Sequence, residues 1–66
     1  MENVKMTIAM LCAYMSMSTE ALADKAGLDR NHLAAIRAGR AKMLADDVIA
    51  LSDATGIDVR NIATKQ

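Results

Sequence analysis

Apolar residues recur every three or four positions along most of this chain, which is the spacing of one face of an α-helix. The spacing predicts helices over about residues 2–14, 19–26, 30–38 and 45–55, with a short last helix from 59 to about 63. The residues predicted to face inward are Val4, Ile8, Leu11, Met15, Leu22, Ala23, Ala26, Leu33, Ile36, Val48, Leu51 and Ile62. We expect an all-α fold in which four or five helices form a compact bundle.

The residues between these stretches are typical of helix ends. Ser18 and Asp29 precede the second and third stretches, where their side chains can accept hydrogen bonds from the free N–H groups of the first turn. Gly27, Gly39 and Gly56 each follow a helical stretch, and glycine at that place can adopt the left-handed conformation that ends a helix. The sequence therefore predicts where each helix stops as well as which face is buried.

Length and composition limit the classes of function. A chain of 66 residues is expected to form one domain, spanning 1–66. Folding of so short a chain buries only about 60% of the surface that the unfolded chain exposes, which disfavours a deep pocket for a large cofactor. The sequence has no nucleophile elbow, phosphate-binding glycine loop or HExxH pair. We therefore expect neither an enzyme nor a cofactor, and no small-molecule ligand.

Cysteine usage and the apolar N-terminal segment bear on location. The single Cys12 excludes an intrachain disulfide and a zinc finger, and fits a reducing, cytoplasmic setting. In that setting Cys12 is better explained as a small buried apolar residue than as a redox switch. The apolar segment 6–17 is too short to cross a membrane, and the only positive charge before it, on Lys5, is offset by Glu2. A buried helix is favoured over a signal peptide, and we expect no membrane partner.

Residues 19–38 have the pattern of a helix-turn-helix. Only residues 27–29 separate the two predicted helices, which forces them to cross steeply. Ala23 is small enough to let the helices approach closely. Leu33 and Ile36 would hold one face of the third helix against the core and leave the opposite face exposed.

The resemblance to a known family extends over nearly the whole chain. The sequence STEALADKAGLDRNHLAAIRAGRAK, residues 18–42, resembles the Xre family of lambda-repressor-like and Cro-like DNA-binding domains. The segment VIALSDATGIDVRNI, residues 48–62, is similar to the family's fourth helix, closing Gly-Ile/Val pair and fifth helix. The resemblance implies a transcriptional regulator that binds double-stranded DNA, most simply a Cro-like repressor of a phage or mobile element. Such a repressor would occupy its operator as a homodimer.

The resemblance also implies a role for individual residues. The third helix would enter the major groove, where arginine can pair with guanine, asparagine with adenine, and alanine with a thymine methyl group. The residues expected to read bases are Arg30, Asn31, Ala34 and Ala35. The residues expected at the DNA backbone are Ser18, Thr19, His32, Arg37, Arg40 and Lys42. His32 is placed there because the sequence offers it no cysteine, histidine or carboxylate partner nearby except Asp29.

Charge supports this interpretation once its distribution is considered. Eight basic and eight acidic residues give a net charge of zero, which taken alone disfavours a polyanionic partner. The basic residues between positions 30 and 42, where no acid occurs, are Arg30, Arg37, Arg40 and Lys42. The acids between positions 43 and 58, where no base occurs, are Asp46, Asp47, Asp53 and Asp58. The chain is therefore dipolar, with its basic part beside the predicted reading helix.

The sequence departs from the family pattern at four places. Arg37 and Cys12 stand where the family often has an acid and a base that form an internal salt bridge. Arg37 would instead complement the C-terminal dipole of its own helix or reach a phosphate. Met43 stands in place of a frequent proline, and Thr55 in place of a packing leucine. Thr55 would face a partner or bond back to the preceding turn.

The first predicted helix leaves an alternative open, because it is apolar almost all round. Its methionines would fill the core loosely, or its surface would contact another subunit, with Met10 and Tyr14 as candidate dimer contacts. The alternative function is a protein-interaction module, such as an antitoxin or adaptor, that keeps the helix-turn-helix scaffold and binds its partner through this helix.

Overall fold

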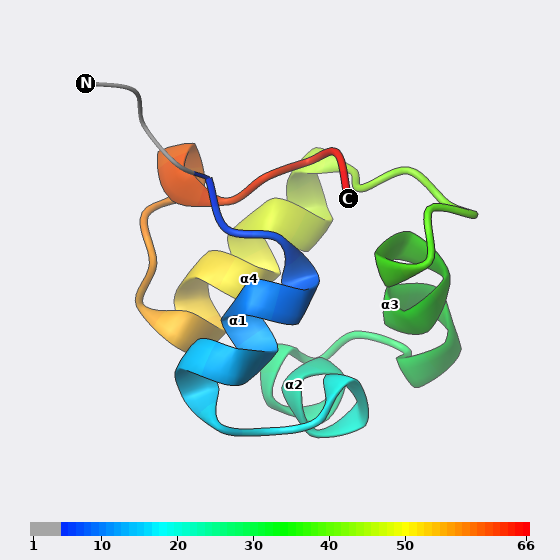
Figure 1. Ribbon diagram of the computed structural model, residues 1–66, viewed down its shortest axis with the longest axis horizontal. Coiled ribbons are helices and arrows are strands. Elements are labelled where there is room, and N and C mark those ends of the chain that lie inside the picture. The colour runs from blue at the N-terminus through cyan, green and yellow to red at the C-terminus, as the bar shows by residue number, and fades with distance from the viewer. Residues whose placement is uncertain (1–4) are drawn as a thin grey trace.

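The computed structural model describes residues 5–66, and these fold into four α-helices and one short 3₁₀ helix (Figure 1). The helices are α1 (Ile8–Met15), α2 (Thr19–Ala26), α3 (Arg30–Arg37), α4 (Ala45–Thr55) and the 3₁₀ helix η1 (Val59–Asn61). Within this range there is no β-strand, so the predicted all-α class is confirmed. None of these helices has the length and apolarity that crossing a membrane requires.

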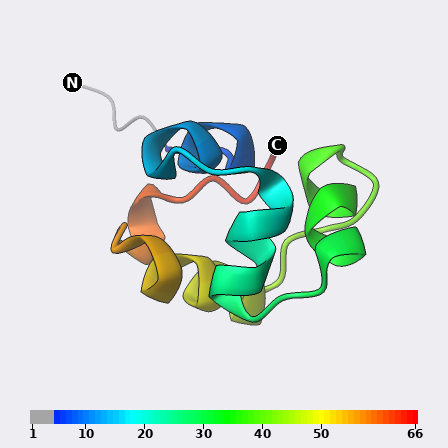
Figure 2. The ribbon, with the colours of Figure 1, turned by 90° about the horizontal axis from the view of Figure 1, so that it is seen from below.

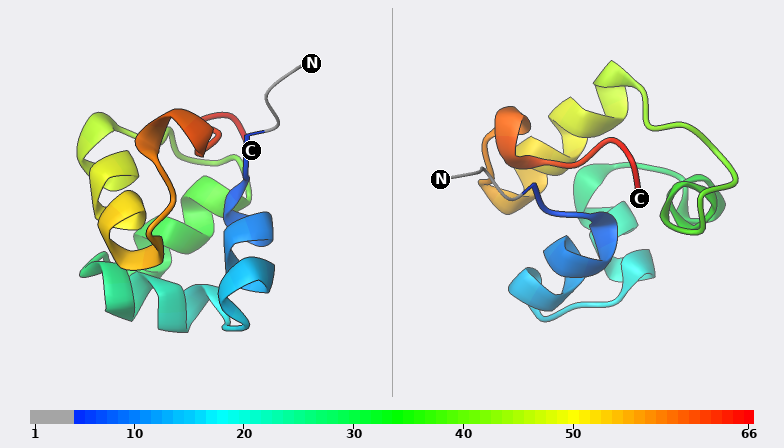
Figure 3. Two further views of the ribbon diagram at one scale, coloured as in Figure 1. Left: turned by 90° about the vertical axis from the view of Figure 1, so that its left-hand side faces the viewer. Right: turned by 45° about the horizontal axis from the view of Figure 1, so that its top comes forward.

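Helix α2 lies in the middle of the arrangement. It packs against α1, α3 and α4, while η1 packs against α4. Figure 2 shows α3 on one side of α2 and the remaining helices on the other. In the left view of Figure 3, α2 runs along the bottom and α3 slants upward behind it. Helix α3 is therefore a peripheral element, attached to the domain chiefly through α2.

The core takes one or two large side chains from each α-helix, together with Ile62 after η1. The largest fully buried side chains are Ile8, Leu11, Leu22, Leu33, Ile36, Leu51 and Ile62. Ala23 is also fully buried, where α2 meets its neighbours. All eight were predicted to face inward. The predictions for Met15, Ala26 and Val48 hold in part, because these residues are half-buried, and Val4 lies outside the described residues.

The predicted start of the first helix was wrong over residues 5–7, and residues 2–4 lie outside the described range. Helix α1 begins at Ile8, because Thr7 caps it by accepting a hydrogen bond from the Met10 N–H. Residue Met6 instead pairs with the segment around Ile62: its N–H donates to the Asn61 carbonyl at 2.7 Å. The apolar spacing does continue before Ile8, but Met6 pairs with the segment around Ile62 and is not part of a helical turn.

The other helix ends follow the glycine pattern, apart from the end of α1. Gly27 and Gly56, with φ of 72° and 79°, end α2 and α4 in the left-handed conformation as predicted. Helix α3 ends at Arg37, one residue before the predicted Ala38, and Gly39 after the cap Ala38 is left-handed as predicted, with φ of 84°. The left-handed residue after α1 is Ser16, which no glycine pattern would reveal.

The last helix is shorter than predicted and of the 3₁₀ type. It covers Val59–Asn61 and does not reach Ala63. Ile62 is extended and buried, and the Ala63 N–H donates to the Met6 carbonyl at 2.8 Å. Pairing with the N-terminal segment therefore replaces the final helical turn.

Two residues of α4 test the assigned core. We expect Leu51→Ala to lower the free energy of unfolding by about 2–5 kcal/mol, because it removes fully buried methyl groups and leaves a cavity. Ile49 is 52% exposed on the same helix, so Ile49→Ala should change the free energy of unfolding by less than about 1 kcal/mol. Urea denaturation followed by circular dichroism measures both. Equal losses would contradict this core.

Candidate nucleic-acid interface

Helix α3 has one buried and one exposed face. Leu33 and Ile36 are fully buried, whereas Arg30, Asn31 and Ala34 are exposed. The two faces follow from the helical period, because positions 33 and 36 share a face, 31 and 34 lie on the opposite side, and 30 lies between the two. Three of the four residues expected to read bases therefore lie on one accessible surface.

The fourth, Ala35, is half-buried. Its carbonyl accepts hydrogen bonds from the N–H groups of Arg40 and Ala41, at 2.8 and 3.3 Å. These bonds turn the chain back along the end of α3. Ala35 thus contributes to ending the helix as well as to the edge of its exposed face.

Arg30 is already paired within the protein. Its Nε and Nη2 donate to the two carboxylate oxygens of Asp24, at 3.0 and 2.6 Å, across the turn between α2 and α3. These hydrogen bonds, together with the positive charge of Arg30, hold the pKa of Asp24 below its ordinary value. The same hydrogen bonds raise the pKa of Arg30. The Nε–Nη2 edge of the guanidinium therefore faces a carboxylate in the free protein, while Nη1 is not part of this contact.

Two residues expected at the DNA backbone, Thr19 and Arg37, lie together. Arg37 Nη1 donates to the hydroxyl of Thr19, the first residue of α2. The same hydroxyl is 3.7 Å from Cys12 Sγ on α1. Cys12 is buried, in line with the prediction of a small buried residue. The positions where the resembled family has a salt bridge are thus connected here through a threonine hydroxyl.

The start of α2 carries free donors. Ser18 Oγ accepts a hydrogen bond from the Ala21 N–H at 3.1 Å, which confirms Ser18 as the cap. The backbone N–H groups of Thr19 and Glu20 have no hydrogen-bond partner among residues 5–66. Exposed N–H groups at a helix start favour an anion.

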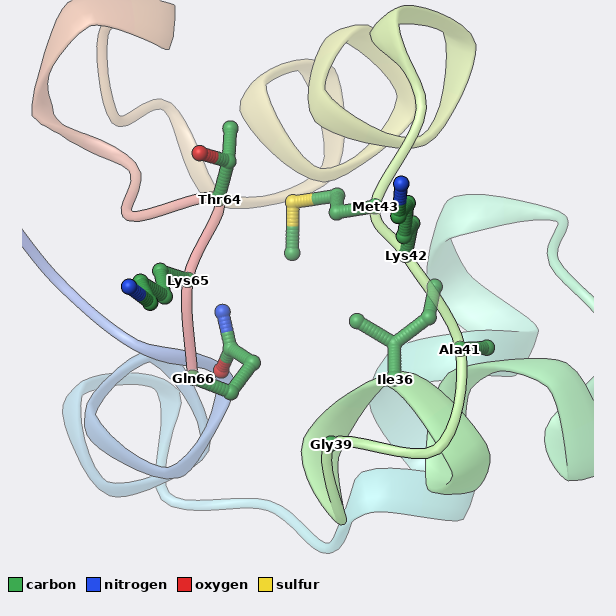
Figure 4. Close-up of a pocket in the computed structure, with 8 residues that line it drawn as sticks. All are labelled: Ile36, Gly39, Ala41, Lys42, Met43, Thr64, Lys65 and Gln66. Carbon is green, nitrogen blue, oxygen red and sulfur yellow. The ribbon is translucent and has the colours of Figure 1, made fainter.

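The segment after α3 is basic and borders a groove. Arg40 and Lys42 are exposed, and within the described part of the chain their side chains form no ion pair. The groove has a volume of about 470 Å³ and lies between residues 36–43 and 64–66. Figure 4 shows the side chains of Ile36 and Met43 approaching it from one side and Gln66 from the other. Met43, where the family often has proline, is buried in the core.

His32 has a partner that sequence reasoning did not find. Its Nε2 lies 3.2 and 3.1 Å from the two carboxylate oxygens of Asp47 on α4. The Asp47 side chain is 8% exposed and also accepts a hydrogen bond from the Leu44 N–H, whereas the His32 side chain is 38% exposed. Fifteen residues separate His32 from Asp47, so no helical spacing relates them.

Two other expectations can be compared with the structure. The Thr55 hydroxyl donates to the Leu51 carbonyl at 2.7 Å, so it bonds back to the preceding turn, one of the two alternatives for this residue. Met10 and Tyr14, the candidate dimer contacts on α1, are 46% and 61% exposed. Among residues 5–66 there is no cluster of side chains that could hold a metal ion.

Comparison with family models, with curated proteins and with solved structures finds no match to this chain in any of the three. The resemblance of residues 18–42 to the Xre family therefore stays a prediction from the sequence.

The pairing of Arg30 with Asp24 predicts how the pKa of Asp24 changes when Arg30 is removed. In Arg30→Ala we expect the pKa of Asp24 to rise toward its ordinary value, because the donated hydrogen bonds and the positive charge are lost. A lowered pKa in the folded state means that this contact stabilises the protein above the unfolded-state pKa of Asp24. The stabilisation is lost as the pH falls through the folded-state pKa. Carbon-13 NMR titration of the carboxyl groups measures the change.

A second exposed pair supplies the control. The pKa of Asp58 is lowered by hydrogen bonds from the Arg60 side chain and backbone. Arg60→Ala should therefore raise the pKa of Asp58 and leave that of Asp24 unchanged. An Asp24 titration that is the same in wild type and Arg30→Ala would contradict the pairing.

Proposed function

We propose that this protein is a sequence-specific double-stranded DNA-binding transcriptional regulator in which α2 and α3 act as a helix-turn-helix. The observation that carries the proposal is the division of α3 into two faces. Leu33 and Ile36 anchor one face in the core, while Arg30, Asn31 and Ala34 remain accessible on the other. An α-helix fits the major groove of B-form DNA, and these side chains offer hydrogen-bonding and apolar contacts to base edges.

The surroundings of α3 support the same proposal. The hydroxyl of Thr19, the guanidinium of Arg37 and the free N–H groups at the start of α2 come together as donors for a phosphate. Beyond α3, the exposed Arg40 and Lys42 can follow the sugar-phosphate backbone. Such contacts set orientation and affinity, whereas base contacts set specificity.

Arg30 can keep Asp24 while it binds a base. The contact with Asp24 uses one N–H of Nε and one of Nη2, so the edge formed by Nη1 and Nη2 still has donors for guanine. The side chain of Asn31 forms no hydrogen bond with the rest of the described chain, so it is also available. In this proposal Arg30 and Asn31 both contribute to base discrimination.

The same proposal includes a dimer that blocks a promoter, as a Cro-like repressor does. One α3 reads only a half-site, and two half-sites lie about one helical turn of DNA apart. The exposed apolar side chains of Met10 and Tyr14 on α1 are the surface we propose for contact between subunits.

Those same side chains favour a second candidate function. A protein-interaction module such as an antitoxin or adaptor would cover Met10 and Tyr14 with a different protein. This candidate predicts no preference among DNA sequences, so the DNA measurements below separate the two functions.

DNA affinity at several salt concentrations, after selection of a preferred duplex from a random pool, tests the first function. We expect Asn31→Ala to cost about 1–3 kcal/mol on the selected duplex, because a bidentate base contact is lost. Lys42→Ala should weaken binding to all duplexes and lower the salt slope by about 1. Lys25→Ala, an exposed lysine on α2 outside the proposed interface, is the matched control. DNA affinity that is unchanged in both Asn31→Ala and Lys42→Ala would refute the proposal.

The dimer contact is tested by sedimentation. We expect Met10→Glu to shift a dimer toward monomers, because a charge would be buried against an apolar surface, and Tyr14→Ala to weaken it through lost apolar contact. Ile49→Ala, exposed on α4, is the control. An unchanged mass for both α1 variants would remove α1 as the interface.

A further inference from the structure

Apolar packing and polar contacts both bear on the orientation of helix α3. It lies at the edge of the molecule beside α2 (Figures 1 and 2). Burial of Leu33 and Ile36 holds one face of the helix against the core. Hydrogen bonds weaken steeply when their angle changes, so polar contacts add a directional restraint on how α3 is turned.

The polar side chains of α3 make three contacts with other helices. Arg30 and Arg37 both bind to α2, through Asp24 and Thr19. His32 alone binds to α4, through Asp47. Within residues 5–66, this is the side-chain hydrogen bond that relates α3 to the body of the domain independently of α2.

The Asp47 carboxylate is itself held firmly. It lies in the first turn of α4, is buried, and accepts the Leu44 N–H at 3.0 Å in addition to the His32 contact. A carboxylate can only accept, so His32 Nε2 must carry the proton in this contact. In a neutral imidazole the other nitrogen, Nδ1, is then an acceptor.

The contact with Asp47 bears on the role of His32. Its Nε2 is engaged by Asp47, so this nitrogen is not available for the phosphate contact that the sequence predicts. Because His32 directly follows Asn31 in the chain, its place suits a role in orienting α3.

We propose that Asp47 is a positioning residue for DNA recognition: through His32 it fixes the orientation of α3, and so sets the preference of the exposed face for one base sequence. The proposal rests on the proposed DNA-binding function. Base-edge hydrogen bonds form over a narrow range of distance and angle, so a small turn of α3 costs specific contacts more than phosphate contacts, which flexible side chains can follow.

The experiment compares two conservative replacements of His32. The amide nitrogen of glutamine reaches about as far from the backbone as Nε2, whereas that of asparagine reaches only as far as Nδ1. His32→Gln can therefore keep the donor to Asp47, and His32→Asn cannot. Asp47→Asn removes the charge from the other partner while keeping an acceptor for the Leu44 N–H.

The quantity measured is the ratio of affinities for the selected duplex and an unrelated duplex, at one salt concentration at which every variant is folded. We expect the ratio to fall by roughly tenfold in His32→Asn, the worth of about one well-made hydrogen bond. In Asp47→Asn the ratio should fall by less, because the charge is lost but an amide oxygen that can accept from His32 remains. We expect His32→Gln to restore most of the ratio. In the double variant His32→Asn with Asp47→Asn, the affinity ratio should be no lower than in the single variant with the lower ratio.

Ring nitrogen-15 NMR gives a second readout that a merely structural role would not move. We expect wild-type His32 at a pH where its ring is neutral to show the tautomer protonated at Nε2, and Asp47→Asn to lose this fixed tautomer. If wild type prefers no duplex, the proposed function fails and the inference with it. If wild type prefers the selected duplex and both His32→Asn and Asp47→Asn keep the ratio, only the positioning role is overturned.

Discussion

The packing of α2 against three other helices is the constraint on which the structure depends. A domain of 66 residues can bury few large side chains, and here each α-helix supplies one or two of them around Leu22 and Ala23. The small Ala23 lets neighbouring helices approach α2 closely. Because α2 occupies the middle, α3 is left at the edge, where Arg30, Asn31 and Ala34 are exposed on one of its faces.

Because α3 lies at the edge, its basic side chains can contact either DNA or acceptors of the same chain. The sequence suggests that they serve DNA, yet in the free protein Arg30, His32 and Arg37 each bind an acceptor of the same chain. Contacts of this kind orient a helix before any partner arrives, which lowers the entropy lost on binding. Proposed recognition of DNA would then rely on Arg30 and Asn31 for discrimination and on Arg40 and Lys42 for affinity.

The sequence predicted the helices well wherever local signals agreed. The bounds of α2 and α4 match the expected 19–26 and 45–55. Apolar spacing and a final glycine coincide in both helices, with Ser18 as the cap of α2 and two acids in the first turn of α4. Helix α1 was extended too far toward the N-terminus because the spacing alone does not reveal that Met6 pairs with Ile62. The last helix was overextended for the same reason, since its final turn gives way to that pairing.

The sequence by itself determined the helical class, most helix bounds and the face of each helix that enters the core, because each depends on residues three or four positions apart. Tertiary structure alone decided the contacts between helices: Arg30 with Asp24, Arg37 with Thr19 and His32 with Asp47. Each depends on the angle and distance at which two helices pack. Periodicity describes one helix at a time, so it carries no record of that geometry.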